Sequence, residues 1–293
     1  MFDLKPVRIE VTNHGLVPFQ PFYADAELLI AWSAGRWVFY ADRDFPAAKV
    51  VEWIGWWEEA AQLYELITSQ PQHLELDLNF GHRKVVSISP HEFWGIGNGR
   101  RVEISRGAFD SPLMDSSLDT KDKHGIVFYE LGRQAGYLYD FYEYAEYTDE
   151  SWRRGFPIYM ECLCRTVVGG IDLSHTRWTN SVVKRWEQSC LDYLDIFGPK
   201  HFEWNRHGFD LGILMGAFLV DLHEKLGTQF MIKFIQELRK RAGAPTSAIE
   251  AAYKVQDAAA AAADHDLSEF FVSRWRWPAY SRLPVCYTNW SEK

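Results

Sequence analysis

The segment Tyr129-Glu130-Leu131-Gly132-Arg133 combines residue types whose spacing bears on metal chemistry. In an H-E-x-x-H helix, two histidines four residues apart bind zinc from one helical face, and the glutamate beside them acts as a general base. Here the glutamate is kept, whereas Tyr129 and Arg133 occupy the two histidine positions. A phenol with a pKa near ~10 is a poor zinc ligand at neutral pH, and a permanently protonated guanidinium is not a ligand. The segment therefore predicts a site that keeps the carboxylate and lacks the metal.

Several interpretations of these residues are open on the sequence. Glu130 and Arg133 are three apart on a predicted helix, so they suit an ordinary surface ion pair worth roughly a few tenths of a kcal/mol. A second interpretation is a buried polar cluster with Tyr129, in which the Arg133 guanidinium replaces the cation and faces Glu130 and Glu161, because unpaired buried carboxylates are costly. A nonstandard metal site is a third. A glycosidase-type pair of Glu130 and Glu161 is a fourth, and it depends on their separation in space.

The elements that must position these residues change character along the chain. Up to about residue 120 the pattern is mixed, with one amphipathic helix over Pro46–Ser69, whose apolar residues recur at three and four. A hairpin is predicted around Ser33-Ala34-Gly35. The predicted strands are Val7–Val11, Glu27–Trp32, Arg36–Ala41, His73–Leu78, Lys84–Ser89 and Arg101–Ser105.

From residue 121 onward the pattern is helical. The predicted helices are Ile126–Tyr144, Phe156–Val168, Asn180–Phe197, Gly208–Leu226, Phe230–Arg241 and Ile249–Ala263. Gly227 is expected to end the fourth of them. The sequence thus predicts an α+β protein with a mixed-sheet subdomain over residues 1–120 and a mostly helical subdomain over residues 121–293, together forming one compact unit.

Three stretches resemble the gluzincin-type zincins, in particular the enhancin-like, mucin-targeting metallopeptidases. Phe128–Gln134 is similar to the H-E-[IL]-G-H-x-x-Q helix, and Gly155–Glu161 is similar to the helix that brings the third, acidic ligand. Asp266–Phe271 with Trp275–Pro278 resembles the D-L-x-x-F-F…W-x-x-P close of that branch, and Leu219–Phe230 resembles its L-x-x-x-x-G-x-x-F helices. The resemblance implies a zincin-like fold, with an active cleft between the sheet subdomain and the helical subdomain.

The resemblance also implies roles for single residues. Glu130 matches the general base, whereas Tyr129 and Arg133 depart from the first two zinc ligands. For the third ligand, Glu150 lies a little early and Glu161 lies late. The glycines at 95, 97 and 99 precede a strand rather than a helix, so they indicate a turn into an edge strand and no dinucleotide site. In zincins such a strand pairs with an extended peptide, so Arg101, Val102 and Glu103 are expected to bind a ligand.

Two functional hypotheses follow, and a third is structural. The first is a pseudo-peptidase without a zinc cofactor, which binds a peptide, a protein or a glycan-bearing segment. The second is a hydrolase or other enzyme in which Glu130 acts as general acid or base with Tyr129, Tyr137 or Glu161 as its partner. In the third, the likeness to zincins is accidental and the chain is a structural helical protein.

Composition excludes some classes of partner. The net charge of −9 argues against nucleic acid and against a polybasic membrane surface. No apolar run approaches the ~20 residues needed to cross a bilayer, and the first residues do not resemble a signal peptide. The four cysteines lack a C-x-x-C pair, so we expect reduced thiols and a cytoplasmic protein. The sequence predicts no oligomeric state.

Overall fold

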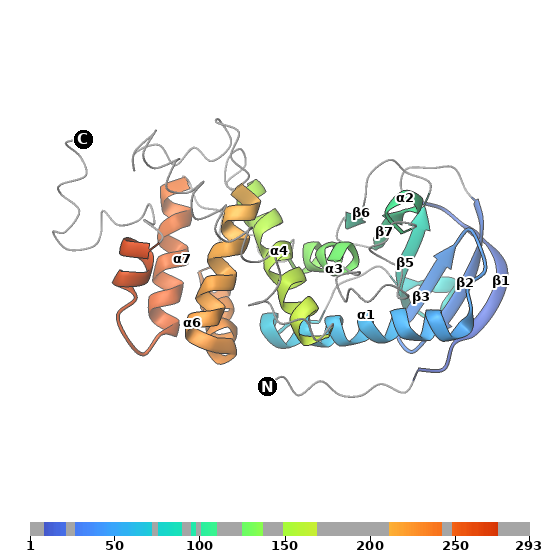
Figure 1. Cartoon of the computed structure of the whole chain (residues 1–293), viewed down its shortest axis with the longest axis horizontal. Coiled ribbons are helices and arrows are strands. Elements are labelled where there is room, and N and C mark those ends of the chain that lie inside the picture. The colour runs from blue at the N-terminus through green and yellow to red at the C-terminus, as the bar shows by residue number, and fades with distance from the viewer. Residues whose placement is uncertain are drawn as a thin grey trace. The chain divides into compact units, whose positions relative to one another are not determined.

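The computed structural model describes residues 9–21, 27–71, 76–89, 95–97, 101–109, 125–136, 149–168, 211–241 and 248–274. These residues belong to two compact units. The first unit holds all the described strands, most of α1, the helices α2 and α3, and the C-terminal end of α4; the second holds the beginning of α4, α6, α7 and η4 (Figure 1). The described elements form an α+β fold with a mixed sheet in the N-terminal part.

Seven described strands form one sheet in the order β1-β2-β3-β5-β7-β6, with β4 paired to β5 outside this path. The strands are β1 (Thr12–Phe19), β2 (Glu27–Ala34), β3 (Trp37–Ala41), β4 (Leu76–Asp77), β5 (Arg83–Ser89), β6 (Gly95–Gly97) and β7 (Val102–Ser105). The pairs β3–β5 and β5–β7 are parallel, and the other pairs are antiparallel. The sheet is therefore mixed, as the sequence predicted.

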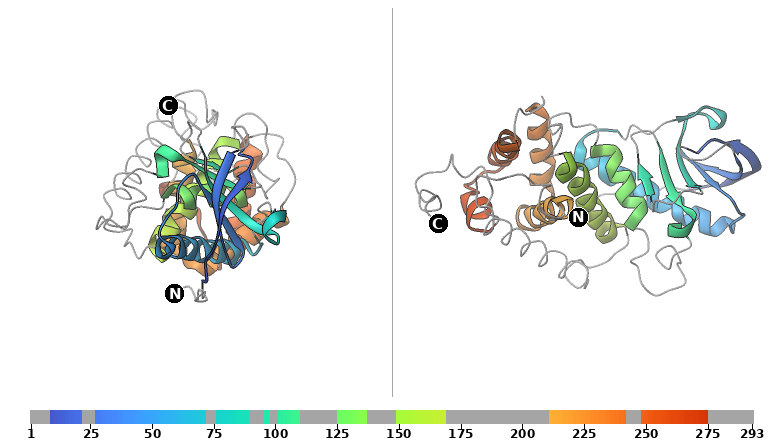
Figure 2. Two further views of the ribbon diagram at one scale, coloured as in Figure 1. Left: turned by 90° about the vertical axis from the view of Figure 1, so that its right-hand side faces the viewer. Right: turned by 90° about the horizontal axis from the view of Figure 1, so that it is seen from above.

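Helix α1 (Ala47–Thr68) covers one face of this sheet because its aromatic residues meet those of β3. Trp57 lies 5.4 Å from the ring of Phe39 and 6.3 Å from the ring of Trp37, and Trp53 lies 5.9 Å from Phe39. All four side chains are buried. Edge-to-face contacts of this kind add roughly 0.5–1.5 kcal/mol per pair to the apolar burial. Figures 1 and 2 show α1 lying along the sheet.

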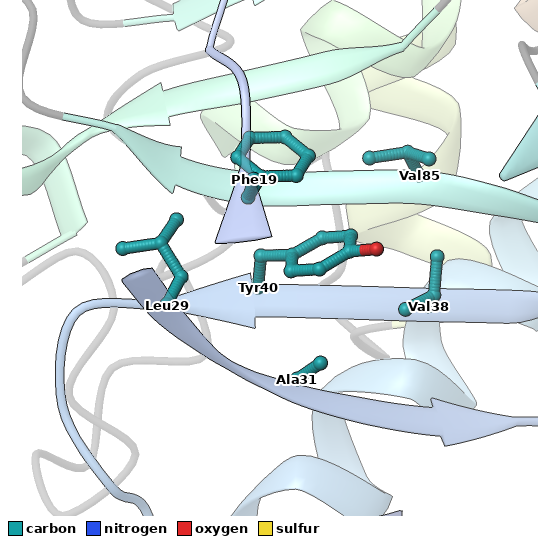
Figure 3. Close-up of a cluster of buried hydrophobic side chains, with 6 residues drawn as sticks. All are labelled: Phe19, Leu29, Ala31, Val38, Tyr40 and Val85. Atoms are coloured by element: carbon teal, nitrogen blue, oxygen red, sulfur yellow. The ribbon is translucent and has the colours of Figure 1, made fainter. Parts of the chain in front are cut away.

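The opposite face of the sheet carries a second apolar cluster, because successive side chains of a strand point to opposite faces. Val38 and Tyr40 alternate with Trp37 and Phe39 along β3 and point away from α1. The cluster comprises Phe19, Leu29, Ala31, Val38, Tyr40 and Val85 (Figure 3). Four strands thus contribute to a core on this side.

In the second unit, α6 (Leu211–Lys240) and α7 (Ala248–Ala262) pack against each other (Figure 1). Gly227 interrupts α6 with φ 80° and ψ 172°, so the element consists of two helices joined at a break. Positive φ is a conformation that favours glycine. A short π-helix, η4 (Glu269–Arg274), follows α7 after Asp266, whose carboxylate accepts hydrogen bonds from the backbone and hydroxyl of Ser268.

Most of the predicted elements in the described residues are confirmed. The hairpin β2–β3, helix α1, strand β5 and helix α7 begin and end within two residues of the predicted bounds. The strand predicted at Val7–Val11 is wrong in its described part, since the strand β1 begins only at Thr12. The helices predicted at Gly208–Leu226 and Phe230–Arg241 are the two parts of α6. The helix predicted at Asn180–Phe197 lies outside the described residues.

Two other helices differ in their bounds. Helix α3 spans Gly125–Gly136, and the rest of the predicted helix lies outside the described residues. Helix α4 spans Asp149–Val167 and begins seven residues before the predicted Phe156, with Pro157 inside it. Proline favours the first turn of a helix, but Pro157 lies beyond the first turn of α4, so it does not mark where this helix begins. Helix α2 (Arg106–Phe109) was not predicted.

Candidate functional site

Glu130 lies on the buried side of α3. Its neighbours Phe128 and Leu131 are buried, as an apolar helix face requires, and Glu130 itself is only 2% exposed. A carboxylate that is this well covered needs a compensating charge or hydrogen bonds to stay ionised. The amphipathic pattern of α3 therefore places an acidic residue where a purely structural helix would carry an apolar one.

The side chain of Glu130 packs against the backbone of Gly95 in β6. A Cβ atom at position 95 would lie 2.8 Å from Cγ and 2.9 Å from Oε1 of Glu130. These separations are shorter than real Cβ contacts, so any other residue at position 95 would have to displace the Glu130 side chain or the strand. The contact fixes α3 to β6 at the point where the Glu130 carboxylate lies.

Arg133 is the charged neighbour of this carboxylate. Its Nη1 lies 3.7 Å from Oε2 of Glu130, and its side chain is 32% exposed. Tyr129 is half-buried on the same helix. The pair is therefore neither a surface ion pair nor a fully buried cluster, since the carboxylate is enclosed and the guanidinium is partly in solvent.

A hydrogen bond from Tyr64 of α1 links this helix to α3. The Tyr64 hydroxyl donates a hydrogen bond to the backbone carbonyl of Phe128. Burial raises the pKa of Tyr64 well above its usual value, and the thiol of Cys164 and the carboxylate of Glu161 on α4 raise it further. Burial likewise raises the pKa of the Cys164 thiol. Tyr64 thus stays protonated and brings α1, α3 and Glu161 into one buried neighbourhood.

Glu161 is 8% exposed, so the structure buries both carboxylates that the sequence singled out. Glu161 is close enough to Tyr64 to affect its pKa, whereas Glu130 is held by Gly95 and Arg133. The predicted contact of Arg133 with Glu161 stays a prediction. Tyr137 lies outside the described residues.

Glu103 and Arg101 lie on the other face of the sheet. Gly95 pairs with Ile104, so the Glu130 side of β6 is the α1 side, and Glu103 points away from it. Glu103 is fully buried, and its Oε1 lies 3.1 Å from Nε of Arg101. The Arg101 guanidinium also lies 5.0 Å from the centre of the Phe19 ring, within the second apolar cluster. The sheet therefore separates this ion pair from Glu130 and Arg133.

The strand predicted as a sheet edge is interior. β7, which carries Val102 and Glu103, pairs with β5 on one side and with β6 on the other. The expectation that Arg101–Ser105 forms the edge is therefore wrong, and Gly95–Gly97 takes that place among the described strands. The glycines at 95, 97 and 99 predict a turn, although glycine within a strand also signals close approach by another group.

The donor set on α3 does not fit a zinc ion. The polar side chains of this helix include Tyr129 and Arg133, and a guanidinium has no lone pair for a metal. Among the described residues, no group of three or more His, Cys, Asp and Glu side chains is arranged to hold a metal ion. No helix in the described part of the chain is long and apolar enough to cross a membrane.

Tyr64 and Gly95 are the two site residues that sequence reasoning missed. Tyr64 lies on the buried side of α1, and a tyrosine among the apolar residues of a helix signals a buried hydroxyl that needs a partner. Gly95 is a glycine within a strand, which signals that another group approaches the backbone closely. Neither signal names the partner, because Phe128 and Glu130 are far away in sequence.

Comparison with solved structures finds a similarity to a metallopeptidase. The structure is similar to the crystal structure of a mutant M1 zinc metallopeptidase from Deinococcus radiodurans, with a TM-score of 0.48 and 13% sequence identity. The match covers 91% of this chain and 52% of the metallopeptidase chain, so this chain spans about half the length of that protein. No protein-family model matches the sequence, and no curated protein matches it.

Proposed function

We propose that the chain is a zincin-like pseudo-peptidase domain that binds an extended segment of a peptide, protein or glycoprotein along the outer edge of β6. The contact between Glu130 and Gly95 carries this proposal. It holds Glu130, which the resemblance to zincins matches to the general base, against the last described strand of the sheet. An edge strand whose outer backbone groups face no described strand is a template for strand addition.

The residues on α3 support binding over zinc-dependent hydrolysis. Arg133 and Tyr129 replace the ligands that would activate a water molecule. The Arg133 cation beside Glu130 reduces the cost of burying that carboxylate, a task that a metal would otherwise share. The site therefore consists of the glycine-containing strand β6 and the helix α3, which packs against it through Glu130.

Binding through β6 alone would be weak. The strand has three residues, and each backbone hydrogen bond contributes only about 0.5–1.5 kcal/mol net. Ligand side chains on either side of the edge must supply the rest of the affinity and the specificity. We therefore expect micromolar or weaker affinity for short unmodified peptides.

The alternative, an enzyme in which Glu130 is the general acid or base, places stricter demands on exposure. A catalytic carboxylate must come within hydrogen-bonding reach of the reacting proton. At 2% exposure and packed against Gly95, Glu130 would have to be uncovered first. This burial favours the binding proposal.

The test is a screen of peptides and glycopeptides for binding by fluorescence anisotropy, followed by an N-methyl scan of the best ligand. In strand addition, N-methyl groups abolish binding at every second residue, because alternate N–H groups face the sheet. A scan without this period of two overturns the strand-addition proposal. Hydrolysis of a bound peptide that is lost in Glu130→Gln, with unfolding unchanged, establishes the enzyme instead.

A further inference from the structure

A hydrogen-bonded histidine bridges the break in α6. The ring of His223 lies 2.9 Å from the Tyr159 hydroxyl through Nδ1 and 3.0 Å from the Thr228 hydroxyl through Nε2. Tyr159 is on α4, whereas His223 and Thr228 are on opposite sides of Gly227. Three helical segments of the second unit therefore meet at one imidazole.

This arrangement suits a neutral imidazole better than an imidazolium. A neutral ring has one nitrogen that donates and one that accepts, and each hydroxyl can take either part. Both hydrogen bonds can therefore form in either tautomer. An imidazolium donates from both nitrogens, so one hydroxyl must turn its hydrogen away and find another acceptor in a largely buried place.

The surroundings of His223 do not favour its charged form. Burial lowers the pKa of His223 to about 4. Among the described side chains of α4, the Tyr159 phenol faces the ring. On α6, the Lys225 ammonium lies 5.4 Å from the centre of the Phe270 ring. Glu224 on the same helix is exposed. Asp221 is buried two residues earlier, which is the opposite side of a helix.

The break at Gly227 is the point at which the two halves of α6 could move relative to each other. Gly227 leaves the helical conformation, so no continuous helical backbone joins the two halves of α6. The second half also contacts the end of α1, where Gln236 donates a hydrogen bond to Ser69 at 3.0 Å. Holding this break in place depends on side chains, among which His223 contacts both sides.

We propose that His223 is a proton-sensitive latch, which in its neutral form fixes the two halves of α6 to α4 and on proton uptake releases the break at Gly227. The expected sign follows from linkage. A released ring takes up a proton near its ordinary pKa of about 6.5, whereas the latched ring resists protonation, so opening increases as the pH falls. With 6.5 and 4 as the two pKa values, opening at pH 5 exceeds opening at pH 7.5 by about 30-fold.

Hydrogen exchange of the whole chain tests the latch. Protection factors of amides on either side of Gly227, corrected for intrinsic exchange, are measured from pH 7.5 to pH 5. We expect them to fall about 30-fold in the wild type and to stay level in His223→Gln, which keeps a donor and an acceptor and cannot be protonated. His265→Gln, at an exposed position after α7, is the matched control and should behave as the wild type.

Two results overturn the proposal. One is an equal fall of protection in His223→Gln and in the wild type. The other is a His223 ring that titrates near pH 6.5 in the folded wild type, followed by the NMR signals of the imidazole. The NMR titration needs no variant, so it decides the matter even where His223→Gln fails to fold.

Discussion

The Glu130 carboxylate and the Gly95 backbone lie so close that no other residue fits at position 95 without displacing one of them. Gly95→Ala should therefore destabilise the first unit, by about 1–3 kcal/mol, the usual cost of overpacking. The measurement is urea unfolding. Gly107→Ala is the matched control, because a Cβ at Gly107 meets nothing within 4 Å.

The same contact predicts a rescue. Glu130→Ala removes the Cγ and carboxylate atoms that a Cβ at position 95 would meet. In a double-mutant cycle, Gly95→Ala should then cost at least 0.5 kcal/mol less in the Glu130→Ala background than in the wild type. Additive effects would show that Glu130 does not determine the need for glycine.

The Tyr64 hydroxyl is predicted to stabilise the position of α3. Tyr64→Phe removes its hydrogen bond to the Phe128 carbonyl and leaves the ring in place. We expect a loss of about 1–2 kcal/mol in the free energy of unfolding, since the group is fully buried. A loss below ~0.3 kcal/mol would mean that the carbonyl needs no donor beyond its helical partner.

Lys84 is predicted to oppose folding at neutral pH. Burial, aided by the nearby Arg36 charge, lowers its pKa to about 8, although its Nζ lies 3.6 Å from Glu65. Lys84→Met should therefore raise stability at pH 7 by on the order of 1 kcal/mol. Glu65 keeps its 2.7 Å ion pair with Arg36 in this variant.

The pH dependence of this effect has a definite sign. The folded pKa of Lys84 is lower than the unfolded value of 10.5, so the unfolded state binds more protons between pH 8 and 10.5. The penalty is complete below pH 8 and disappears as the pH rises to 10.5. Urea unfolding at pH 7 and pH 10 should show the advantage of Lys84→Met shrinking, and an advantage that grows with pH would contradict the argument.

Gly216 is predicted to be essential for helix packing in the second unit. A Cβ there would lie 2.6 Å from Cγ2 of Ile158 and 3.2 Å from the Gly155 carbonyl oxygen. Backbone cannot move away as a flexible side chain can, so Gly216→Ala should cost about 2 kcal/mol or more despite the better helix propensity of alanine. Thermal unfolding monitored by circular dichroism is the measurement, again with Gly107→Ala as control.

The sequence predicted the elements whose pattern is local. The three- and four-residue spacing of apolar side chains located α1, and the alternation around Ser33-Ala34-Gly35 located the hairpin. The edge of the sheet could not be found in this way. Strand order depends on long-range pairing, and β7 lies between β5 and β6 although β6 precedes β7 in the chain.

The candidate site was likewise predictable only where its residues are close together in the sequence. The i,i+3 spacing of Glu130 and Arg133 predicted their ion pair, because both lie on one helix. Spacing could not show that the sheet separates Glu103 from Glu130. That depends on which face each strand residue takes, which a single-residue change of register would reverse.

The crossover between β3 and β5 has a consequence for how the protein folds. Parallel neighbours cannot close through a short turn, so β5 can join β3 only after the chain has travelled through α1. The β2–β3 hairpin needs only local contacts, and we expect it to assemble early, whereas β7, with β6 paired to it, can join the rest of the sheet only after β5. The helix that carries Glu130 depends on both α1 and β6, so it should be among the last elements to reach its native surroundings, and a slow refolding phase should be visible there.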